Sequence, residues 1–279
     1  MIATTTERTF GPKRTFRDKL FDYSSKKIGK ERTKFFFKLY DLGRFDLFGK
    51  PNGAIGAIDI TNRCNLRCRH CYFYAHDYEE KPELSDHEWI EKLESLKDTD
   101  FPFYQCSWIG GEPLLRKDLI ERGMKYFKSN VIATNGTIEL PPWPDVNFYI
   151  SVDGLKDTHD AIRGKGCHDK IKKHANRPEL KIMVSMVINK LNYQEVERFL
   201  EEWKDVGVKG CLFQIHTPIK GLKNDDLWPG WQLRDEILDK LLALKEEKYG
   251  DFIGVPSLVL KLMKSDKCKE ITRNCLFKK

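Results

Sequence analysis

Three cysteines lie close together in the segment TNRCNLRCRHCY: Cys64, Cys68 and Cys71. Thiolates are soft ligands that select iron–sulfur clusters, zinc or copper(I) over magnesium and calcium. Three thiolates on one short loop can hold three irons of a cubane [4Fe–4S] cluster and leave the fourth iron without a protein ligand. The spacing therefore indicates an iron–sulfur site, and a zinc loop or buried thiols are the alternatives.

A zinc site on the same loop would need a fourth ligand, because structural zinc is held by four ligands in a closed tetrahedron. The nearby candidate is His70, which directly precedes Cys71 and would be strained in sharing the metal. The spacing thus favours the cluster over zinc.

Further motifs follow the cysteines, at the ends of successive segments that are expected to be strands. They are Gly110-Gly111-Glu112-Pro113, Thr134-Asn135-Gly136, Ser151-Val152-Asp153-Gly154 and His159-Asp160 with Arg163. In this order the motifs and the cysteine loop resemble the radical S-adenosylmethionine (radical SAM) superfamily, including members that often carry a SPASM- or twitch-type C-terminal extension. One departure is His70, where the family often has an aromatic residue.

The resemblance implies a [4Fe–4S] cluster on Cys64, Cys68 and Cys71 and S-adenosylmethionine (SAM) on the open iron. It implies that SAM is contacted by Gly110, Gly111, Glu112, Asn135, Ser151, Asp153 and Arg163. The glycines would let the backbone approach closely, Glu112 would accept from the SAM ammonium, and Arg163 would pair with the methionine carboxylate. Each residue also has a structural interpretation: a strand-to-helix turn, a capping Asp153 or a solvated Arg163.

The same resemblance implies a reaction. The reduced cluster would cleave SAM to methionine and a 5′-deoxyadenosyl radical, which abstracts hydrogen from a substrate. The cofactor carries this chemistry, so we assign no general acid or base. The expected partners are an electron donor such as flavodoxin or ferredoxin and a substrate that is a peptide or protein, a tetrapyrrole or a lipid. The alternative is a non-catalytic iron–sulfur or zinc protein on the same fold.

Six short apolar runs alternate with helical patterns along the chain. The expected strands are 53–61, 103–110, 130–136, 146–154, 181–189 and 208–218. This alternation predicts a parallel α/β fold. The resemblance implies a partial (β/α)6 TIM-like barrel with an N-terminal helical arm and a short C-terminal helical extension. Ligands of such barrels gather at the C-terminal ends of the strands, where the motifs lie.

Helical signals separate the strands. Ser85 and Glu88 form a capping box, and Asn192 is expected to cap a helix that ends at Gly207. On the last strands, Val187 is expected to be a core residue or an adenine contact. His216 is expected to be either a structural residue or a substrate contact.

Composition limits the kind of protein. The chain has 279 residues, of which 40% are hydrophobic, enough for a core rather than a disordered chain. No apolar run approaches the roughly 18 residues that span a bilayer, and the N-terminus lacks the apolar core of a secretory signal. We therefore expect a cytoplasmic protein whose eight cysteines are reduced or bound to metal.

The net charge of +7 lies entirely in residues 1–50, which hold 13 basic and 6 acidic residues, while the remainder balances at 36 against 36. We expect three regions: a basic, Phe-rich arm (1–50), the radical SAM core (51–220) and a C-terminal extension (221–279). The neutral body gives no support for nucleic-acid binding. The arm is expected either to pack on the core or to contact a membrane surface or a protein.

Two cysteines near the C-terminus, Cys268 and Cys275, are candidate ligands of a second iron–sulfur cluster. Two thiols are few for such a cluster, and only four residues follow Cys275. Iron counting would decide, because about eight irons per chain would support the second cluster and about four would exclude it.

Overall fold

The computed structural model describes residues 16–29, 32–33, 54–71, 73–74, 82–96, 103–218 and 225–271. These residues belong to two compact units. The first unit comprises the described parts of Met1–Ile58, Pro82–Trp108 and Arg116–Val131, and the second those of Asp59–Lys81, Ile109–Leu115 and Ile132–Lys279. All of the motifs expected to bind the cluster or SAM lie in the second unit.

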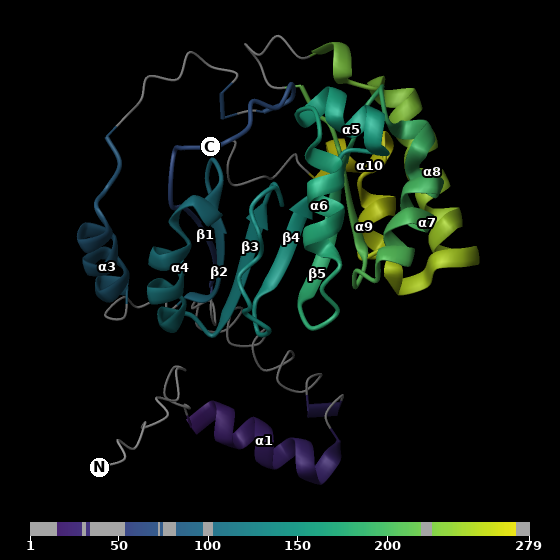
Figure 1. Ribbon diagram of the computed structural model, residues 1–279. Helices are drawn as coiled ribbons and strands as arrows, with labels where there is room; N and C mark the ends of the chain where they lie inside the picture. The colour runs from purple at the N-terminus through teal and green to yellow at the C-terminus, as the bar shows by residue number, and fades with distance from the viewer. Residues whose placement is uncertain are drawn as a thin grey trace, which may run out of the picture. The chain divides into compact units, whose positions relative to one another are not determined.

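Six strands form one sheet in the order β1-β2-β3-β4-β5-β6 (Figure 1). The strands are β1 (Ala54–Asp59), β2 (Phe103–Ile109), β3 (Ser129–Thr134), β4 (Asn147–Ser151), β5 (Lys181–Ile188) and β6 (Cys211–Ile215). Strand β5 pairs in parallel with both β4 and β6. Strands that are successive in sequence are neighbours in the sheet, and parallel neighbours require the crossover connections that the alternating pattern predicted.

The first unit contains α1 (Phe16–Ile28), α3 (Asp86–Ser95), α4 (Lys117–Gly123) and the 3-10 turn η3 (Met124–Tyr126). The capping box predicted for Ser85 and Glu88 is confirmed at the start of α3. Trp108 is fully buried, and its ring packs edge-on against Phe127 at a centroid distance of 5.6 Å. A Cβ at Gly123 would lie 2.6 Å from the Trp108 ring, so this close packing requires glycine.

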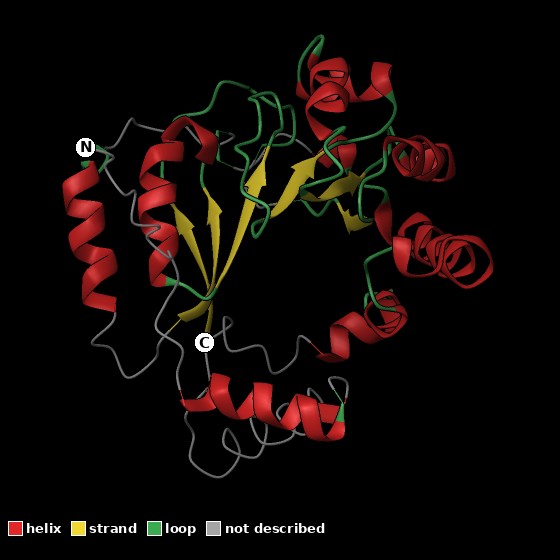
Figure 2. Ribbon diagram, turned by 60° about the horizontal axis from the view of Figure 1, so that its bottom comes forward, coloured by secondary structure: helices red, strands yellow, loops and turns green. Residues whose placement is uncertain are grey.

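The second unit carries the remaining helices. They are α5 (Lys156–Arg163), α6 (Cys167–Ala175), α7 (Val196–Val206), α8 (Gly230–Leu244), α9 (Ser257–Leu262) and α10 (Ser265–Ile271). Shorter turns are η2 (Pro113–Arg116), which runs into the first unit, η4 (Tyr193–Glu195), η5 (Asp225–Leu227), η6 (Lys245–Tyr249) and η7 (Gly250–Phe252). Figure 2 shows the described helices in red and the strands in yellow.

Helix α7 has the apolar face that its sequence predicts, with Phe199, Leu200 and Trp203 buried, and it ends at Gly207 with a φ of +88°. The prediction that Asn192 caps this helix is wrong. Asn192 precedes η4, and its side chain instead accepts from the Asn189 N–H at 2.7 Å. The side-chain oxygen of Asn192 is bonded within the loop that precedes the helix, because asparagine side chains readily accept from nearby backbone N–H groups.

The strands of the second unit have two different faces. On β5, Ile182, Val184, Met186 and Ile188 are buried and alternate with half-buried Met183, Ser185 and Val187. The ring centres of Phe213 on β6 and Phe199 on α7 are 6.0 Å apart, so α7 packs on the buried face of these strands. The opposite face carries Ser151, which pairs in register with Ser185.

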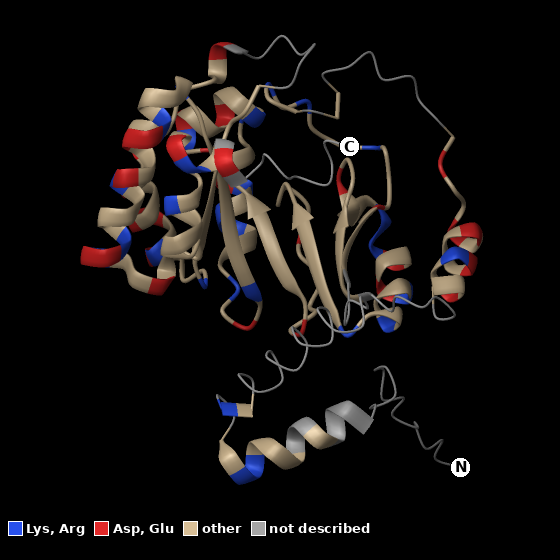
Figure 3. Cartoon of the chain, turned by 180° about the vertical axis from the view of Figure 1, so that it is seen from behind, with Lys and Arg blue, Asp and Glu red and all other residues tan. Residues whose placement is uncertain are grey.

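The structure addresses part of what the sequence predicts about charge, the N-terminal arm and membrane-spanning helices. In Figure 3 both signs of charge are interspersed over the helices, in line with the neutral body. Helix α1 confirms a helix in the N-terminal arm, whereas Phe35 and the segment that follows lie outside the described residues. Among the helices described, none is long and apolar enough to cross a membrane.

Candidate cofactor site

The three cysteines lie on the loop that follows β1, and all are half-buried free thiols. Arg67 holds the first part of the loop, because its guanidinium donates to the Cys64 carbonyl at 2.9 Å and lies 4.0 Å from the centre of the Tyr74 ring. A 3.1 Å hydrogen bond from the Cys71 N–H to the Cys68 carbonyl closes the turn between the second and third cysteines. These contacts fix the backbone conformation of the loop on both sides of Cys68.

Among the described residues, hydrogen-bond donors are directed at two of the sulfur atoms, those of Cys64 and Cys68. Cys64 Sγ accepts from the Leu66 N–H at 3.4 Å and from Asn135 Nδ2 at 3.8 Å. Cys68 Sγ accepts from Arg163 Nη1 at 3.9 Å. Donors aimed at the sulfur atoms of a ligand are one means by which proteins tune an iron–sulfur cluster.

Burial raises the pKa of the Cys64 thiol, and it raises the pKa of Cys68 to about 11 although the positive charge of Arg163 opposes it. Both thiols are therefore protonated at neutral pH in the metal-free chain. Metal ligation requires the thiolate, so loading the site must release protons.

The residues on the loop fit a cubane cluster. The donor set is three thiols from one short segment, with N–H donors directed at two of them, and soft sulfur donors are those that iron–sulfur clusters use. Within the described ranges, no group of three or more His, Cys, Asp and Glu side chains is arranged to hold a single metal ion. The fit rests on the donor chemistry.

The two glycines after β2 pack against the cysteine loop. The Gly111 N–H donates to the Thr61 carbonyl at 2.8 Å. A Cβ at Gly110 would lie 2.4 Å from the Thr61 carbonyl oxygen, and one at Gly111 would lie 2.2 Å from that of Arg63. Gly110 also has a φ of +135°. The close approach that these glycines allow is therefore to the cysteine loop, and their contact with SAM stays a prediction.

Glu112 is completely buried and bridges two strand ends. Its Oε1 accepts from Thr134 Oγ1 at 2.7 Å and from the Leu114 N–H at 3.0 Å, while Oε2 accepts from the Asn135 N–H at 2.7 Å. Burial raises the pKa of this carboxyl, although the hydrogen bonds oppose the rise. The bridging role was not anticipated from the sequence, and a contact with the SAM ammonium stays a prediction.

Asn135 is turned toward the cysteine loop. Its Nδ2 donates to Asn65 Oδ1 at 2.8 Å as well as to Cys64 Sγ, and its Oδ1 accepts from the Thr137 N–H at 2.9 Å. The structure thus brings Asn135 and the first cysteine together, as expected for residues of one site.

Asp153 is the centre of a second group of contacts. Its side chain is fully buried, and Oδ2 accepts from Arg163 Nε at 2.5 Å and from His70 Nε2 at 2.6 Å. Oδ1 accepts from the Val187 N–H at 2.9 Å. Burial alone would raise the pKa of Asp153, but Arg163 and His70 lower it well below its usual range. The carboxylate is therefore ionised at neutral pH.

The Arg163 guanidinium lies between Asp153 and the cysteine loop. Its side chain is 9% exposed. Burial by itself would lower the pKa of Arg163, but the negative charge of Asp153 and the neighbouring Cys68 raise it. This permanently charged group lies beside the Cys68 thiol, and its pairing with the methionine carboxylate stays a prediction.

The other candidates lie at the same edge of the sheet. Ser151 ends β4 in register with Ser185, and Val187 reaches the site through its backbone N–H to Asp153. His216 is buried just after β6, where its N–H donates to the Ile188 carbonyl at 2.8 Å. The contact of His70 with Asp153 was not predicted from the sequence. The position of His70 between Cys68 and Cys71 was the feature that could have indicated a role in the site.

The C-terminal helices hold the candidates for a second cluster. Cys268 lies on α10, where Sγ accepts from Arg234 Nη1 at 3.6 Å and donates to the Ser265 carbonyl at 3.7 Å. Cys275 lies outside the described residues. The second cluster therefore stays a prediction.

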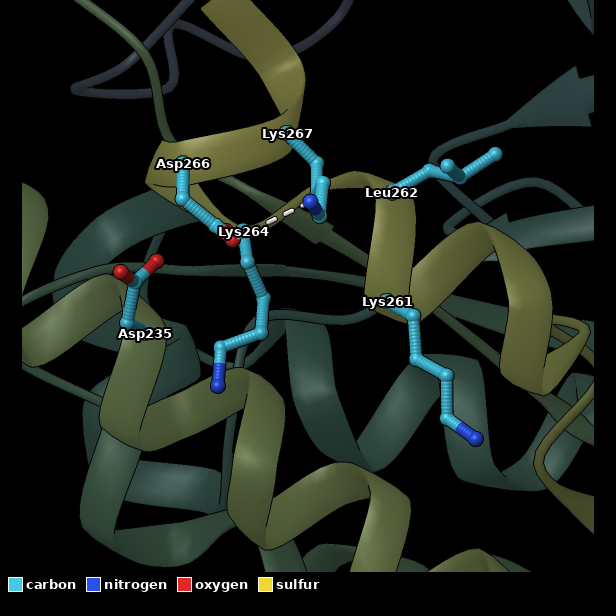
Figure 4. Close-up of a pocket in the computed structure, with 6 residues that line it drawn as sticks. All are labelled: Asp235, Lys261, Leu262, Lys264, Asp266 and Lys267. Carbon is cyan, nitrogen blue, oxygen red and sulfur yellow. Dashed lines mark ion pairs between the residues drawn. The ribbon is translucent and has the colours of Figure 1, made fainter.

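A shallow hollow of about 430 Å³ lies in the same region (Figure 4). It is lined by Asp235, Lys261, Leu262, Lys264, Asp266 and Lys267. Lys267 pairs with Asp266 at 3.7 Å, and Lys264 pairs with Asp239 at 2.7 Å. The hollow contains none of the residues predicted to bind the cluster or SAM.

Comparison with known proteins supports this picture. A family model, the Radical SAM superfamily, matches residues 58–229. The Fe-coproporphyrin III synthase of Methanosarcina barkeri is 30% identical over 251 residues, covering 78% of this chain and 61% of the relative. The pre-heme d1 synthase of Dinoroseobacter shibae is 31% identical over 181 residues, covering 60% of this chain and 44% of the relative. The chain thus spans about half the length of these relatives.

The solved structure of native anSMEcpe with bound AdoMet superposes with a TM-score of 0.58 at 19% identity, covering 71% of this chain and 60% of that one. This likeness shows the fold, a partial (β/α)6 TIM-like barrel, and confirms the predicted architecture. The family match covers more than half of the chain and includes the cysteine loop and the motifs that follow it. The chain belongs to the radical SAM superfamily, a superfamily of enzymes that use a [4Fe–4S] cluster and SAM.

Proposed function

We propose that this protein is a radical SAM enzyme in which Cys64, Cys68 and Cys71 hold a [4Fe–4S] cluster that binds SAM. The observation that carries this is the cysteine loop itself, with hydrogen-bond donors at two sulfurs and the buried Arg163 beside Cys68. When bound, the reduced cluster supplies one electron that cleaves SAM to methionine and a 5′-deoxyadenosyl radical, which takes a hydrogen atom from the substrate.

The chain's own residues would bind and orient the reactants. Arg163 offers a fixed positive charge to the methionine carboxylate. Asn135 would link the end of β3 to the cysteine loop, because its N–H donates to the buried Glu112 and its Nδ2 donates to Cys64 Sγ. Ser151 lies on the half-buried sheet face and would reach the carboxylate or ribose of SAM.

Reductive SAM cleavage tests the proposal. Anaerobically purified protein is incubated with SAM and dithionite, or with reduced flavodoxin or ferredoxin, and 5′-deoxyadenosine is measured. We expect product from the wild type and none from Cys68→Ala. The matched control is Cys211→Ala, because Cys211 is buried in β6 away from the loop. A colourless protein that binds zinc and resists iron reconstitution would support the non-catalytic alternative instead.

For the substrate we propose a tetrapyrrole. The names of both relatives above refer to tetrapyrrole products, and this chain carries an aromatic pair in which Trp231 is exposed and Trp228 is half-buried. The Trp228 and Trp231 rings pack edge-on at 5.5 Å, and the Arg234 guanidinium lies 5.1 Å from the centre of the Trp231 ring. Aromatic and guanidinium groups suit a planar conjugated ring with carboxylate substituents.

The segment that precedes this aromatic pair follows β6 and contacts the edge of the sheet where the motifs lie. Asp226 forms an ion pair with Arg69 of the cysteine loop. The Leu227 carbonyl accepts from the Lys190 N–H, just after β5, at 3.1 Å. The segment before Trp228 therefore lies beside both the cysteine loop and the end of β5.

Direct binding tests the substrate class without requiring turnover. Coproporphyrin III and its iron complex are titrated into the protein while tryptophan fluorescence and the porphyrin absorption band are followed. We expect saturable quenching that Trp231→Ala weakens about tenfold, in line with the loss of one stacking contact. Leu258→Ala, at an exposed apolar residue of α9, is the control. Unaltered porphyrin spectra would overturn the assignment and leave a peptide, a protein or a lipid as the substrate.

A further inference from the structure

We propose that His70 and Asp153 are positioning residues that fasten the cysteine loop to α5 and β5, and that Asp153 acts on SAM only through Arg163. The inference deepens the proposed function and rests on it for the identity of the bound group. It changes the expected role of Asp153 from a ligand contact to an anchor, and it gives His70 a role of its own.

The Asp153 carboxylate accepts hydrogen bonds from groups of the protein itself. Its three donors come from three different parts of the chain: His70 from the cysteine loop, Arg163 from α5 and Val187 from β5. The residue has no exposed surface. Both oxygens are thus occupied by donors of the protein, so the side chain is committed to internal contacts and does not face a ligand.

His70 contributes a donor in this arrangement. The ionised Asp153 carboxylate can only accept hydrogen bonds, so the proton of the 2.6 Å contact resides on Nε2 of His70. The imidazole is 10% exposed and lies between two of the cysteines in sequence. It therefore ties the centre of the loop to the body of the barrel.

A backbone hydrogen bond forms a second link between the same two segments. The Arg69 N–H donates to the Ile162 carbonyl near the end of α5 at 2.8 Å. Loss of the His70 contact would leave this link intact, so the loop would loosen without detaching. A phenylalanine at position 70 would keep a planar ring, but it would leave a buried Asp153 oxygen short of one donor.

The consequence for SAM follows from Arg163. Its Nε is held by Asp153 while Nη1 is directed at Cys68 Sγ. The Nε edge of the guanidinium is therefore occupied, and a methionine carboxylate must be met through the terminal nitrogens. Without the Asp153 charge, this orientation is no longer imposed, and the carboxylate contact weakens although Arg163 is still present.

Hydrogen–deuterium exchange tests the anchor directly. The full chain is measured before and after cluster reconstitution, following the peptide that covers residues 62–71. We expect at least fivefold faster exchange there in His70→Phe and near wild-type exchange in His70→Gln, which keeps an N–H donor. The matched control is Arg69→Ala, which removes an exposed ion pair of the same loop and should leave exchange unchanged. Equal exchange in wild type and His70→Phe would overturn the proposal.

The second readout is the spectrum of the reduced cluster. Electron paramagnetic resonance spectra are recorded with increasing SAM, together with iron content and melting temperature. We expect His70→Phe and Asp153→Asn to keep about four irons yet to need roughly tenfold more SAM for the spectral change. His70→Gln should restore wild-type behaviour. A merely structural role would lower iron content and melting temperature together without shifting the SAM dependence of the remaining cluster.

These outcomes separate the two proposals. If the wild type forms no 5′-deoxyadenosine but His70→Phe still loosens the loop, the proposed function fails and the anchor stands. If 5′-deoxyadenosine forms in Asp153→Asn with unchanged SAM dependence, the anchor fails and the function stands.

Discussion

The two sides of the cysteine loop are built in different ways. On the Cys64 side, Sγ accepts from the Leu66 N–H and the Asn135 amide, and the buried Glu112 carboxyl accepts from the Thr134 hydroxyl and the Asn135 N–H. Around Cys68 the Arg163 guanidinium forms an ion pair with the fully buried Asp153, whose carboxylate also accepts from His70 Nε2. A hydrogen bond from a neutral donor can be lost at modest cost, whereas a buried ion pair that loses one partner is strongly destabilising. The Cys68 side should therefore be the more sensitive to substitution and to pH.

The largest effect is expected from Asp153→Ala. Removing this carboxylate leaves the Arg163 guanidinium buried without its counter-charge, which typically costs about 3–5 kcal/mol of unfolding free energy. Urea denaturation of the anaerobically prepared protein measures the loss. The double substitution Asp153→Ala with Arg163→Met should recover part of it. A loss below about 1 kcal/mol would mean that the pair is solvated, contrary to its burial.

Acid should weaken the Cys68 side next. His159 is fully buried, and its Nδ1 accepts from the Asp153 N–H at 3.0 Å. Burial, with a contribution from Arg163, lowers the pKa of His159 to about 4. The folded state then binds fewer protons than the unfolded state below pH 6.5, so stability falls as the pH decreases from about 6.5 to 4. We expect a loss of up to ~3 kcal/mol over that range. Urea midpoints at pH 7, 5.5 and 4.5 measure it, and the fall should be smaller in His159→Gln.

A smaller effect is expected on the Cys64 side from Glu112→Gln. In the variant, one carboxyl oxygen is replaced by an NH₂ group that cannot accept a hydrogen bond. One of the buried N–H groups that now donate to Glu112 is then left unpaired, which costs about 1–3 kcal/mol of unfolding free energy. The measurement is again urea denaturation, alongside Asp153→Asn as the matching substitution on the other side. A larger loss in Glu112→Gln than in Asp153→Asn would reverse the order of the two sides.

The smallest effect is expected from Arg69→Ala. The ion pair with Asp226 is about half exposed on both partners, and exposed pairs contribute about 0–1 kcal/mol. Melting temperatures at low and high salt should differ little between wild type and variant. A drop comparable to that of Asp153→Ala would show that the loop depends on this surface pair.

The order of the elements and the place of the site were predictable from local pattern. The spacing of Cys64, Cys68 and Cys71 indicates the cluster chemistry, because ligand type and separation along a short loop are properties of the sequence itself. Alternating apolar runs predict the strands, and Ser85 with Glu88 predicts the start of α3. Parallel strands then bring every strand-end motif to the same edge of the sheet.

Which side chains meet within that edge was decided by the tertiary structure. The sequence predicts Glu112 as a ligand contact, and only the folded chain shows that this side chain is also buried and hydrogen-bonded to the end of β3. His70 and Asp153 are 83 residues apart, and no periodicity relates positions so far apart in the chain. The contacts of Asn192 were also not predictable from the sequence, although they are local. Its side-chain oxygen accepts from the Asn189 N–H instead of capping the helix.

The sequence by itself therefore determined the chemistry of the donor set, the alternation of strands and helices, and membership of the radical SAM superfamily. Only the tertiary structure decided how the donors are supported: neutral hydrogen bonds at Cys64 and a buried ion pair at Cys68. The physical reason is that local pattern depends on neighbouring residues. The partner of a buried charge, in contrast, is chosen by the packing of segments that are distant in sequence.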